Sequence, residues 1–379
     1  MRIGVLAKGG ADWMGGVYYT LNLVRALRSL PIDQQPDVFL LIGNDDQREP
    51  FREIADLAEV CVVPPQETSV LPAPVINPAL VRLLADKGVD LIFPCMRSLG
   101  ADFATPWLAW VPDFQHVHHR EFFSEEECRQ RDAQFGRLAA DARLVVVSSQ
   151  DALADFERLH PAQRGKGHVL RFATVPPSEW LTPDLLETVR RFGLPDRYLI
   201  LPNQFWAHKN HAVAFEAVAL LAERGLDVHL VCTGRTDDPR RPEHFGRLMA
   251  FVESRRIRGR IHVLGLIDRL QQIQVMRAAA AVVQPSLFEG WSTVVEDARA
   301  LGKRIFLSDI PVHREQYPDG AIYFDPHRAD LLAAAILAVW DSPCAAREQE
   351  AVAAQQARVT AYARAFLAIA GELLGAYER

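Results

Sequence analysis

Residues 281–302 read AVVQPSLFEGWSTVVEDARALG, a short apolar strand followed by a turn and a helix. The run Ala281–Val283 does not alternate with polar residues, which is typical of a strand buried on both faces of a parallel sheet. Ser292 is a good N-cap residue, and Val295–Leu301 have helical character up to a stop at Gly302. This strand–helix unit indicates an α/β fold.

The same unit recurs along the chain. Val17, Leu21, Val24 and Leu27 recur at steps of three and four and predict one face of the first helix. The expected strands are Ile3–Ala7, Val38–Ile42, Val60–Val63, Leu91–Phe93, Leu108–Val111, Leu144–Val147, Tyr198–Leu201, Val228–Val231, Ile261–Leu264, Ala281–Val283 and Ile305–Leu307.

A break separates two sets of these units. It contains Val175-Pro176-Pro177-Ser178 and Gly193-Leu194-Pro195, which are linker and turn signals. We therefore expect two Rossmann-like domains, residues 1–175 and 176–356, and a C-terminal helix, residues 357–379, that packs back on the first domain.

Composition excludes several classes of protein. The net charge is 42 − 48 = −6, which is unlike a dedicated nucleic-acid binder. The five cysteines (Cys61, Cys95, Cys128, Cys232 and Cys344) are odd in number and have no CxxC spacing, which argues against a disulfide framework and a structural zinc site. Met1–Ala7 is too short for a signal peptide, and no apolar run approaches the ~20 residues of a membrane span. We expect a cytoplasmic protein with at most peripheral contact with the inner face of a membrane.

The turn after Val283 carries groups that suit a phosphorylated ligand. Free N–H groups at the start of the following helix favour a phosphate. Glu289 lies just before that start and Asp297 lies about one turn inside it, so one carboxylate could hold sugar hydroxyls and the other ribose hydroxyls. The alternative is that Glu289 lies in a solvated loop and that Glu296 and Asp297 only add charge to the first helical turn.

This stretch resembles the C-terminal signature of family-4 retaining glycosyltransferases, in which a Glu is followed, after seven residues, by a second Glu. Glu289 matches the first acid and Asp297 the second, with Glu296 as its neighbour. The resemblance implies the GT-B fold, in which two Rossmann-like lobes have parallel sheets that face a central cleft. It also places Gly290, Trp291, Ser292 and Thr293 beside the donor.

A second stretch, residues 203–211, supports the resemblance. The family usually has Gly-Arg here, then a Lys about five residues after the Arg, and both cations hold the donor diphosphate. Lys209 matches the Lys, whereas Asn203-Gln204 replaces Gly-Arg. Without the resemblance, Lys209 would be interpreted as a surface Lys. His208 and His211 could both face one side of a helix, but no third ligand is evident, so no metal site is expected.

Two further loops of the second lobe fit the family. Leu266 and Ile267 follow a strand at the position that lies near the nucleotide base. Glu315, in the loop after Ile305–Leu307, is similar to a residue that braces the donor site. No Asp-x-Asp is present, so a lysine and a helix dipole would replace a metal ion.

The first lobe gives fewer signals. Gly15 and Gly16 precede the first helix; in the family a glycine-rich loop here faces the diphosphate, although an ordinary βα turn would also explain them. The family often has His-Asp after the strand at Leu108–Val111. Here Pro112 occupies the His position, Asp113 keeps the acid, and His116 is the candidate to replace the missing imidazole as a catalytic residue.

The resemblance implies transfer of a hexosyl group from a nucleoside diphosphate sugar, with retention and without a cofactor. Lys209 and Glu289 are the expected catalytic residues of the second lobe. GDP-mannose is the first guess for the donor, and a saccharide or lipid-linked saccharide of cell-surface polysaccharide is the expected acceptor. Alternatives are a nucleotide-sugar epimerase, a phosphorylase and a non-catalytic nucleotide-sugar-binding protein. The G-x-G-x-x-G fingerprint of a dinucleotide enzyme is not met.

Overall fold

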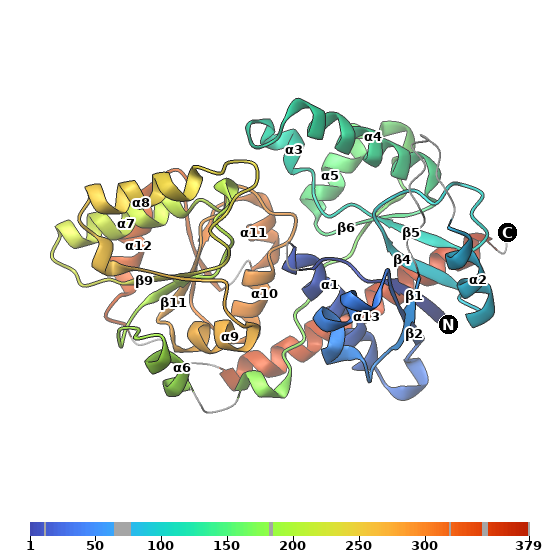
Figure 1. Ribbon diagram of the computed structural model, residues 1–379, viewed down its shortest axis with the longest axis horizontal. Helices are drawn as coiled ribbons and strands as arrows, with labels where there is room; N and C mark the ends of the chain where they lie inside the picture. Colours follow the sequence, from blue (N-terminus) through green and yellow to red (C-terminus); the bar gives the residue numbers. More distant parts are fainter. Residues whose placement is uncertain (11–12, 64–76, 182–184, 318–319, 343–347, 378–379) are drawn as a thin grey trace. The chain divides into compact units, whose positions relative to one another are not determined.

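The structure is a computed structural model that describes residues 1–10, 13–63, 77–181, 185–317, 320–342 and 348–377. The chain forms two compact units, which are described separately. The N-terminal unit comprises Met1–His118, Glu125–Val175 and Gln356–Arg379, and the C-terminal unit comprises His119–Ser124 and Pro176–Gln355. Each has one parallel sheet flanked by helices (Figure 1). The expected α/β class with two parallel sheets is confirmed.

The N-terminal sheet has seven strands in the order β3-β2-β1-β4-β5-β6-β7. Every neighbouring pair is parallel; Gly4, for example, lies opposite both Phe39 and Ile92. The central strands are buried on both faces, as their unbroken apolar runs predict. The strands are β1 (Arg2–Leu6), β2 (Asp37–Ile42), β3 (Glu59–Val62), β4 (Leu91–Cys95), β5 (Trp107–Trp110), β6 (Val145–Val147) and β7 (Gly167–Val169).

Helices cover both faces of this sheet. Apolar side chains of α2, α4 and α5 share one core cluster with the strands. On the other face, Phe93 of β4 lies between Tyr19 of α1 and Phe366 of α13, with ring centroids 6.1 and 5.3 Å away. The α-helices are α1 (Met14–Arg28), α2 (Pro78–Lys87), α3 (Gln115–His118), α4 (Glu125–Asp141), α5 (Gln150–Leu159) and α13 (Glu348–Tyr377), and the 3-10 helices are η1 (Ile32–Gln34), η2 (Asp45–Ile54) and η4 (Pro161–Gln163).

Helix α13 contains the most apolar long segment of the described chain. Its part Ala353–Ala376 is long and apolar enough to cross a membrane by length and composition, which corrects the expectation that no segment approaches that limit. The segment has no long unbroken apolar run, because polar residues such as Gln355, Arg358 and Arg364 interrupt it. Val359, Tyr362, Phe366 and Leu373 are buried at helical spacing, which is the pattern of a helix that packs in a protein core.

The C-terminal sheet has six parallel strands in the order β10-β9-β8-β11-β12-β13. Its first strand in sequence, β8, lies in the middle, so the chain builds outward to β10 and then returns to pair β11 with β8. Such a reversal is where open α/β sheets bind ligands. The strands are β8 (Leu199–Leu201), β9 (Leu230–Thr233), β10 (Ile261–Gly265), β11 (Ala281–Gln284), β12 (Ile305–Ser308) and β13 (Ala321–Phe324).

The helices of this unit also form two layers. Residues of α7, α8 and α12 pack on one face of the sheet, and residues of α9 and α10 pack on the other (Figure 1). The α-helices are α6 (Leu185–Arg191), α7 (His211–Glu223), α8 (His244–Ser254), α9 (Arg269–Ala278), α10 (Thr293–Ala300), α11 (Pro311–Gln316) and α12 (Ala329–Val339), and the 3-10 helices are η3 (Arg120–Phe122), η5 (Ser178–Leu181), η6 (Ala207–Lys209) and η7 (Arg258–Arg260).

All eleven expected strands are present within a few residues, but β7 and β13 were missed. Both are edge strands. β7 (Gly167–Val169) has no apolar run, and its three residues are only partly buried. β13 reads AIYF, a short apolar run of which only Phe324 is buried. The four described cysteines are free and buried, and Cys344 lies outside the described residues.

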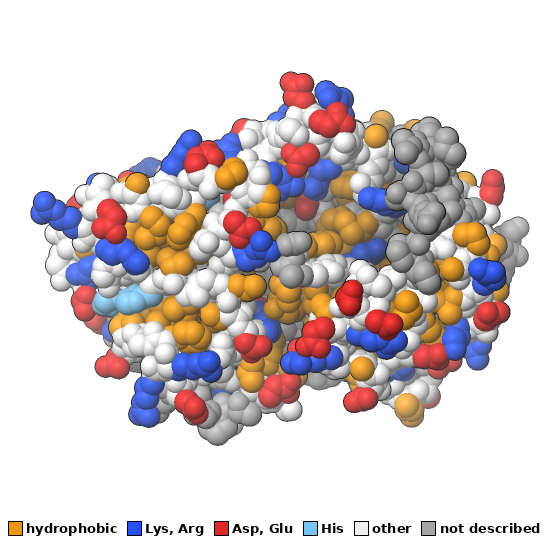
Figure 2. Space-filling view, in the orientation of Figure 1, with side chains coloured by type: hydrophobic (Ala, Val, Ile, Leu, Met, Phe, Trp, Pro, Cys, Tyr) orange, Lys and Arg blue, Asp and Glu red, His pale blue; other side chains and the backbone are white. Residues whose placement is uncertain are grey.

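Charged side chains of both signs are interspersed over the face drawn in Figure 2. The described part of this face has no extended basic surface. This distribution agrees with the small negative net charge of the chain.

Candidate active site

The site lies where the order of the C-terminal sheet reverses, at the carboxyl ends of β8 and β11. Two hydrogen bonds join the loops that follow these strands. Leu287 N donates to His208 O at 2.8 Å, and Asn210 Nδ2 donates to Pro285 O at 3.1 Å. Asn210 has φ of 55°, a left-handed conformation that Asn tolerates and that starts helix α7. Because β8 and β11 are neighbours in the sheet, the loops that follow them lie side by side although they are distant in sequence.

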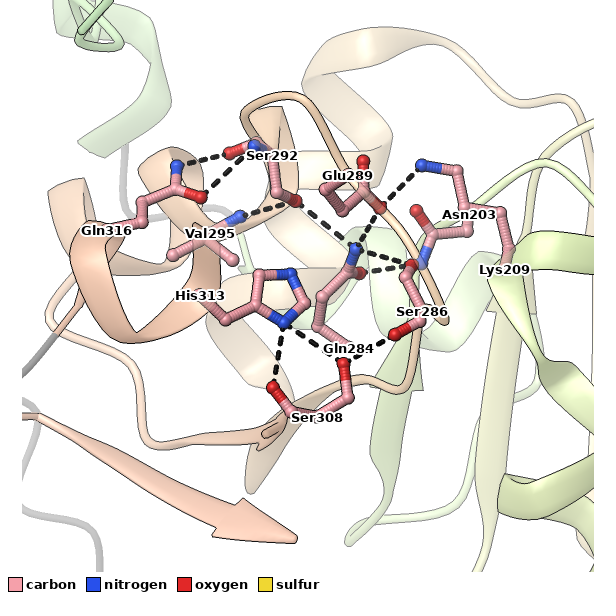
Figure 3. A network of polar contacts seen from close by, with 10 residues as sticks. All are labelled: Asn203, Lys209, Gln284, Ser286, Glu289, Ser292, Val295, Ser308, His313 and Gln316. Atoms are coloured by element: carbon pink, nitrogen blue, oxygen red, sulfur yellow. Dashed lines mark hydrogen bonds and ion pairs between the residues drawn. The ribbon is translucent and has the colours of Figure 1, made fainter. Parts of the chain in front are cut away.

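An ion pair between Lys209 and Glu289 connects these loops. Lys209 Nζ lies 2.7 Å from Glu289 Oε1, and the side chains are 15% and 9% exposed (Figure 3). Gln284 Nε2 donates to the same oxygen at 2.8 Å. Glu289 Oε2 has no hydrogen-bond partner within the described part of the chain. One carboxylate oxygen is therefore held by the protein, and the other can accept hydrogen bonds from a ligand.

Gln284, the last residue of β11, is the centre of this network, and the sequence analysis did not identify it. Its Oε1 accepts a hydrogen bond from Asn203 Nδ2 at 2.7 Å. Its Nε2 also lies 3.1 and 3.2 Å from the hydroxyls of Ser286 and Ser292 (Figure 3). A polar side chain at the end of a buried strand is the signal that could have revealed it, because such a side chain needs polar partners.

The start of helix α10 is built to receive an anion. Ser292 is the N-cap residue, as expected, and its hydroxyl accepts a hydrogen bond from Val295 N at 3.4 Å. Gln316 bonds both the N–H and the carbonyl of Ser292. The N–H groups of Thr293 and Val294 have no partner among the described residues. Two open N–H groups at a helix start favour a negatively charged group.

Three buried histidines surround the ion pair, and burial keeps them neutral. Desolvation lowers the pKa of His211 to about 3 and that of His313 to about 4, and it lowers the pKa of His208 strongly. Lys209 is therefore the cation of this cluster. His313 Nδ1 lies 3.0 Å from the Ser308 carbonyl, which can only accept, so this nitrogen carries the proton. No group of three metal-binding side chains occurs within the described ranges.

The other donor-binding candidates of this unit lie in or near these loops. Gln204 Oε1 accepts a hydrogen bond from Arg235 N at 3.1 Å, so this amide braces the loop after β9. At the end of β10, Leu266 is 59% exposed and Ile267 packs partly against the core. Gly290 and Trp291 lie in the turn before α10 and are half-buried. Glu315 is also half-buried, and its neighbour Gln316 makes the bonds to Ser292.

Glu296 and Asp297 are both buried and paired with arginines. Each is 1% exposed. Arg269 Nη2 lies 2.7 Å from Asp297 Oδ2, and Arg299 Nη1 lies 3.2 Å from Glu296 Oε1. These contacts go beyond the simple first-turn charge of the alternative interpretation. A ribose contact by Asp297 would have to share this carboxylate with Arg269.

The catalytic candidates of the N-terminal unit have structural partners on α4. Asp113 Oδ1 accepts hydrogen bonds from Gln115 N at 2.9 Å and from Arg131 Nη2 at 2.8 Å. His116 is 1% exposed, and its Nε2 lies 2.9 Å from Asp132 Oδ1. Burial lowers the pKa of His116. These contacts indicate a structural role for His116, and its catalytic role remains a prediction.

Gly15 and Gly16 occupy the first turn of α1. A Cβ atom on Gly16 would lie 2.7 Å from the Trp13 ring, and one on Gly9 would lie 2.4 Å from the Trp13 carbonyl oxygen. The loop is thus packed against itself closely enough to require glycine at positions 9 and 16. This packing explains Gly9 and Gly16 without a ligand, whereas a Cβ atom on Gly15 would lie 3.2 Å from the nearest atom of the Trp13 side chain.

Known proteins resemble the chain most clearly in their fold. Residues 188–360 match the family described as glycosyl transferases group 1. Sucrose-phosphate synthase from Thermosynechococcus elongatus is 18% identical, with a TM-score of 0.66 over 100% of this chain and 98% of that chain. A glycosyltransferase from Rickettsia africae is 15% identical, with a TM-score of 0.70 and 98% of both chains covered.

HepE from Anabaena, solved in complex with UDP and glucose, is 16% identical, with a TM-score of 0.67 over 100% of this chain and 99% of that chain. No curated protein matches the chain in sequence.

The fold is that of the GT-B glycosyltransferases, with two units that each contain a parallel sheet flanked by helices. The match over residues 188–360 to the glycosyl transferases group 1 family agrees with the resemblance that Glu289 and Lys209 indicated.

Proposed function

We propose that the chain transfers a hexosyl group from a nucleoside diphosphate hexose to an acceptor hydroxyl. The observation that carries this proposal is the Lys209–Glu289 pair at the point where the sheet order reverses, next to the open N–H groups of Thr293 and Val294. These groups together offer a cation, two N–H donors and a carboxylate oxygen. A sugar linked to a diphosphate needs this set of partners.

Each side chain then has a separate task. Negative charge develops on the diphosphate as the glycosidic bond breaks, and groups already aimed at that charge lower the barrier. Lys209 and the start of α10 supply this stabilisation. Glu289 Oε2 accepts hydrogen bonds from sugar hydroxyls and fixes the orientation of the ring. Asp297 is the proposed ribose ligand, in competition with Arg269.

The donor is a hexose carried by UDP or GDP. GDP-mannose is the donor first expected from the sequence. The solved complex of HepE with UDP and glucose supports a UDP-linked hexose as the second candidate donor. Thermal unfolding with GDP, UDP, dTDP and ADP separates the bases. A ligand at 100 times its Kd stabilises the protein by about 2.7 kcal/mol.

The acceptor is a saccharide or a lipid-linked saccharide of cell-surface polysaccharide, used at the cytoplasmic face of a membrane. Transfer is tested by incubating the protein with the donor that stabilises it and a panel of such acceptors, with NMR of the product to establish retention. An incubation without acceptor detects an epimerase. We expect transfer to survive EDTA, and a loss that Mg²⁺ or Mn²⁺ restores would contradict metal independence.

A further inference from the structure

The hydrogen bonds from Asn203 through Gln284 to Glu289 can run in only one direction. Glu289, paired with the Lys209 ammonium, is an ionised carboxylate and can only accept. Gln284 must therefore present its NH₂ group to Glu289 and its carbonyl to Asn203. Asn203 must in turn present its own NH₂ group. The charge of Glu289 thus determines the orientation of two amides behind it (Figure 3).

We propose that Gln284 is a positioning residue that holds Glu289 for sugar binding; this inference rests on the proposed function. The Lys209 ammonium and the Gln284 amide share Glu289 Oε1. When Lys209 turns to the donor diphosphate, Gln284 is the described side chain that still donates to this oxygen. Glu289 then keeps its orientation with Oε2 open to the sugar, in the empty and in the loaded site.

Burial makes this role difficult to replace. Gln284 is fully buried and Asn203 is 5% exposed, so water does not substitute for a lost amide donor. A purely structural role is the competing explanation, since Gln284 also bonds Ser286 and Ser292. The two roles differ in one property: only positioning of Glu289 depends on which proton donor faces the carboxylate.

The first test is Gln284→Glu, which keeps the shape and replaces the NH₂ group by a carboxyl oxygen. Two carboxylates at hydrogen-bond distance do not both ionise easily, so the pair shares a proton over an extended pH range. The shared proton replaces the missing amide donor. We expect the ratio of variant kcat to parent kcat to be near one at about pH 5.5 and to be at most one tenth at pH 8. A profile parallel to that of the parent would overturn the proposal.

The second test acts from a distance through Asn203→Asp. The carboxylate that this substitution introduces cannot donate to the Gln284 carbonyl, so the amide turns over and presents oxygen to Glu289. We expect kcat at a saturating donor concentration to fall at least tenfold. Ser286→Ala is the matched control, since it removes another partner of the same nitrogen and leaves the path to Glu289 intact. Equal losses in the two variants would favour the structural role.

A readout without catalysis separates this inference from the proposed function. In Gln284→Glu the shared proton is bound more tightly in the folded than in the unfolded state. Stability should therefore fall, relative to the parent, as pH rises above the unfolded carboxyl pKa of about 4.3. Adding Glu289→Gln exchanges the two groups and should remove this dependence. If the pH dependence of stability persists in the double variant, Gln284 and Glu289 are not coupled. If the pH dependence vanishes but the parent transfers no sugar, only the proposed function fails.

Discussion

The two units are built from the same strand–helix pattern, yet their candidate site residues are used differently. In the C-terminal unit, Lys209 and Glu289 come from loops 80 positions apart and meet at 2.7 Å with one carboxylate oxygen left open. In the N-terminal unit, Asp113 and His116 bond to Arg131 and Asp132 of the nearby helix α4. A residue at the end of a strand points to function when its partner comes from another loop and part of its hydrogen-bonding capacity remains open.

Sheet order explains this difference. In the C-terminal sheet the order reverses between β8 and β11, and these are the strands that precede Lys209 and Glu289. In the N-terminal sheet it reverses between β1 and β4, whereas Asp113 and His116 follow β5, one strand further out. Ligands bind at such a reversal, so the position of β5 favours a structural role for His116.

The largest effect is expected at Glu289. Glu289→Ala should lower kcat by about 10²–10³, the loss typical when one preorganised group at the reacting centre is removed. The Kd of the nucleoside diphosphate should stay the same, because Glu289 is assigned to the sugar. Calorimetry and initial rates measure the two quantities.

Two other carboxylates serve as comparisons for Glu289. Asp309→Ala, an exposed acid paired with Arg314, should leave both quantities unchanged. Asp297→Ala should weaken nucleotide binding instead. If Glu289→Ala weakened nucleotide binding and Asp297→Ala lowered only kcat, the assignment of the two acids would be wrong.

The C-terminal unit should lose stability in mild acid because of its buried neutral histidines. Burial lowers the pKa of His313 to about 4. The same side chain binds a proton near pH 6.5 in the unfolded chain, whereas in the folded chain it stays neutral until the pH is much lower. Stability from this group is fully present above pH 6.5 and falls by about 3 kcal/mol as pH drops to 4. Urea unfolding of His313→Gln should show a shallower pH slope, whereas the exposed control His327→Gln should keep the parent slope. Equal slopes in all three proteins would contradict this account.

Lys209 should have the next largest effect. A hydrogen bond to a charged group contributes about 1.5–3 kcal/mol, so Lys209→Ala should lower kcat/KM by at least tenfold. The measurement is steady-state kinetics with the donor varied. Lys87→Ala in the N-terminal unit removes a partly exposed ion pair with Glu59 and should change nothing measurable. A parent-like value for Lys209→Ala would remove this residue from the site.

The smallest effect on transfer is expected at His116. His116→Ala removes a buried ring that bonds Asp132 and packs on Phe135, so it should lower stability by about 1–3 kcal/mol while the folded fraction keeps its kcat. His118→Ala removes a more exposed ring and should cost less. A His116 variant with parent-like unfolding and a strongly reduced kcat would instead establish the catalytic role that the resemblance suggested.

Much of the fold and part of the site could be predicted from local sequence. Central strands such as β4 and β5 are buried on both faces and therefore appear as unbroken apolar runs. The α10 start could be predicted because Ser292 and Gly302 act within one turn of the helix they delimit. The edge strand β7 could not be predicted in this way, because its residues Gly167, His168 and Val169 are only partly buried and form no apolar run.

The sequence by itself determined which residue types carry the chemistry: a lysine, a carboxylate and a helix start, each at the end of a strand. Only the tertiary structure decided how they are used. Pairing of β8 with β11 brings Asn203, Gln284 and Glu289 into hydrogen-bond contact, and packing on α4 buries His116. These outcomes depend on which strands and helices are neighbours, and no local window of sequence contains that information.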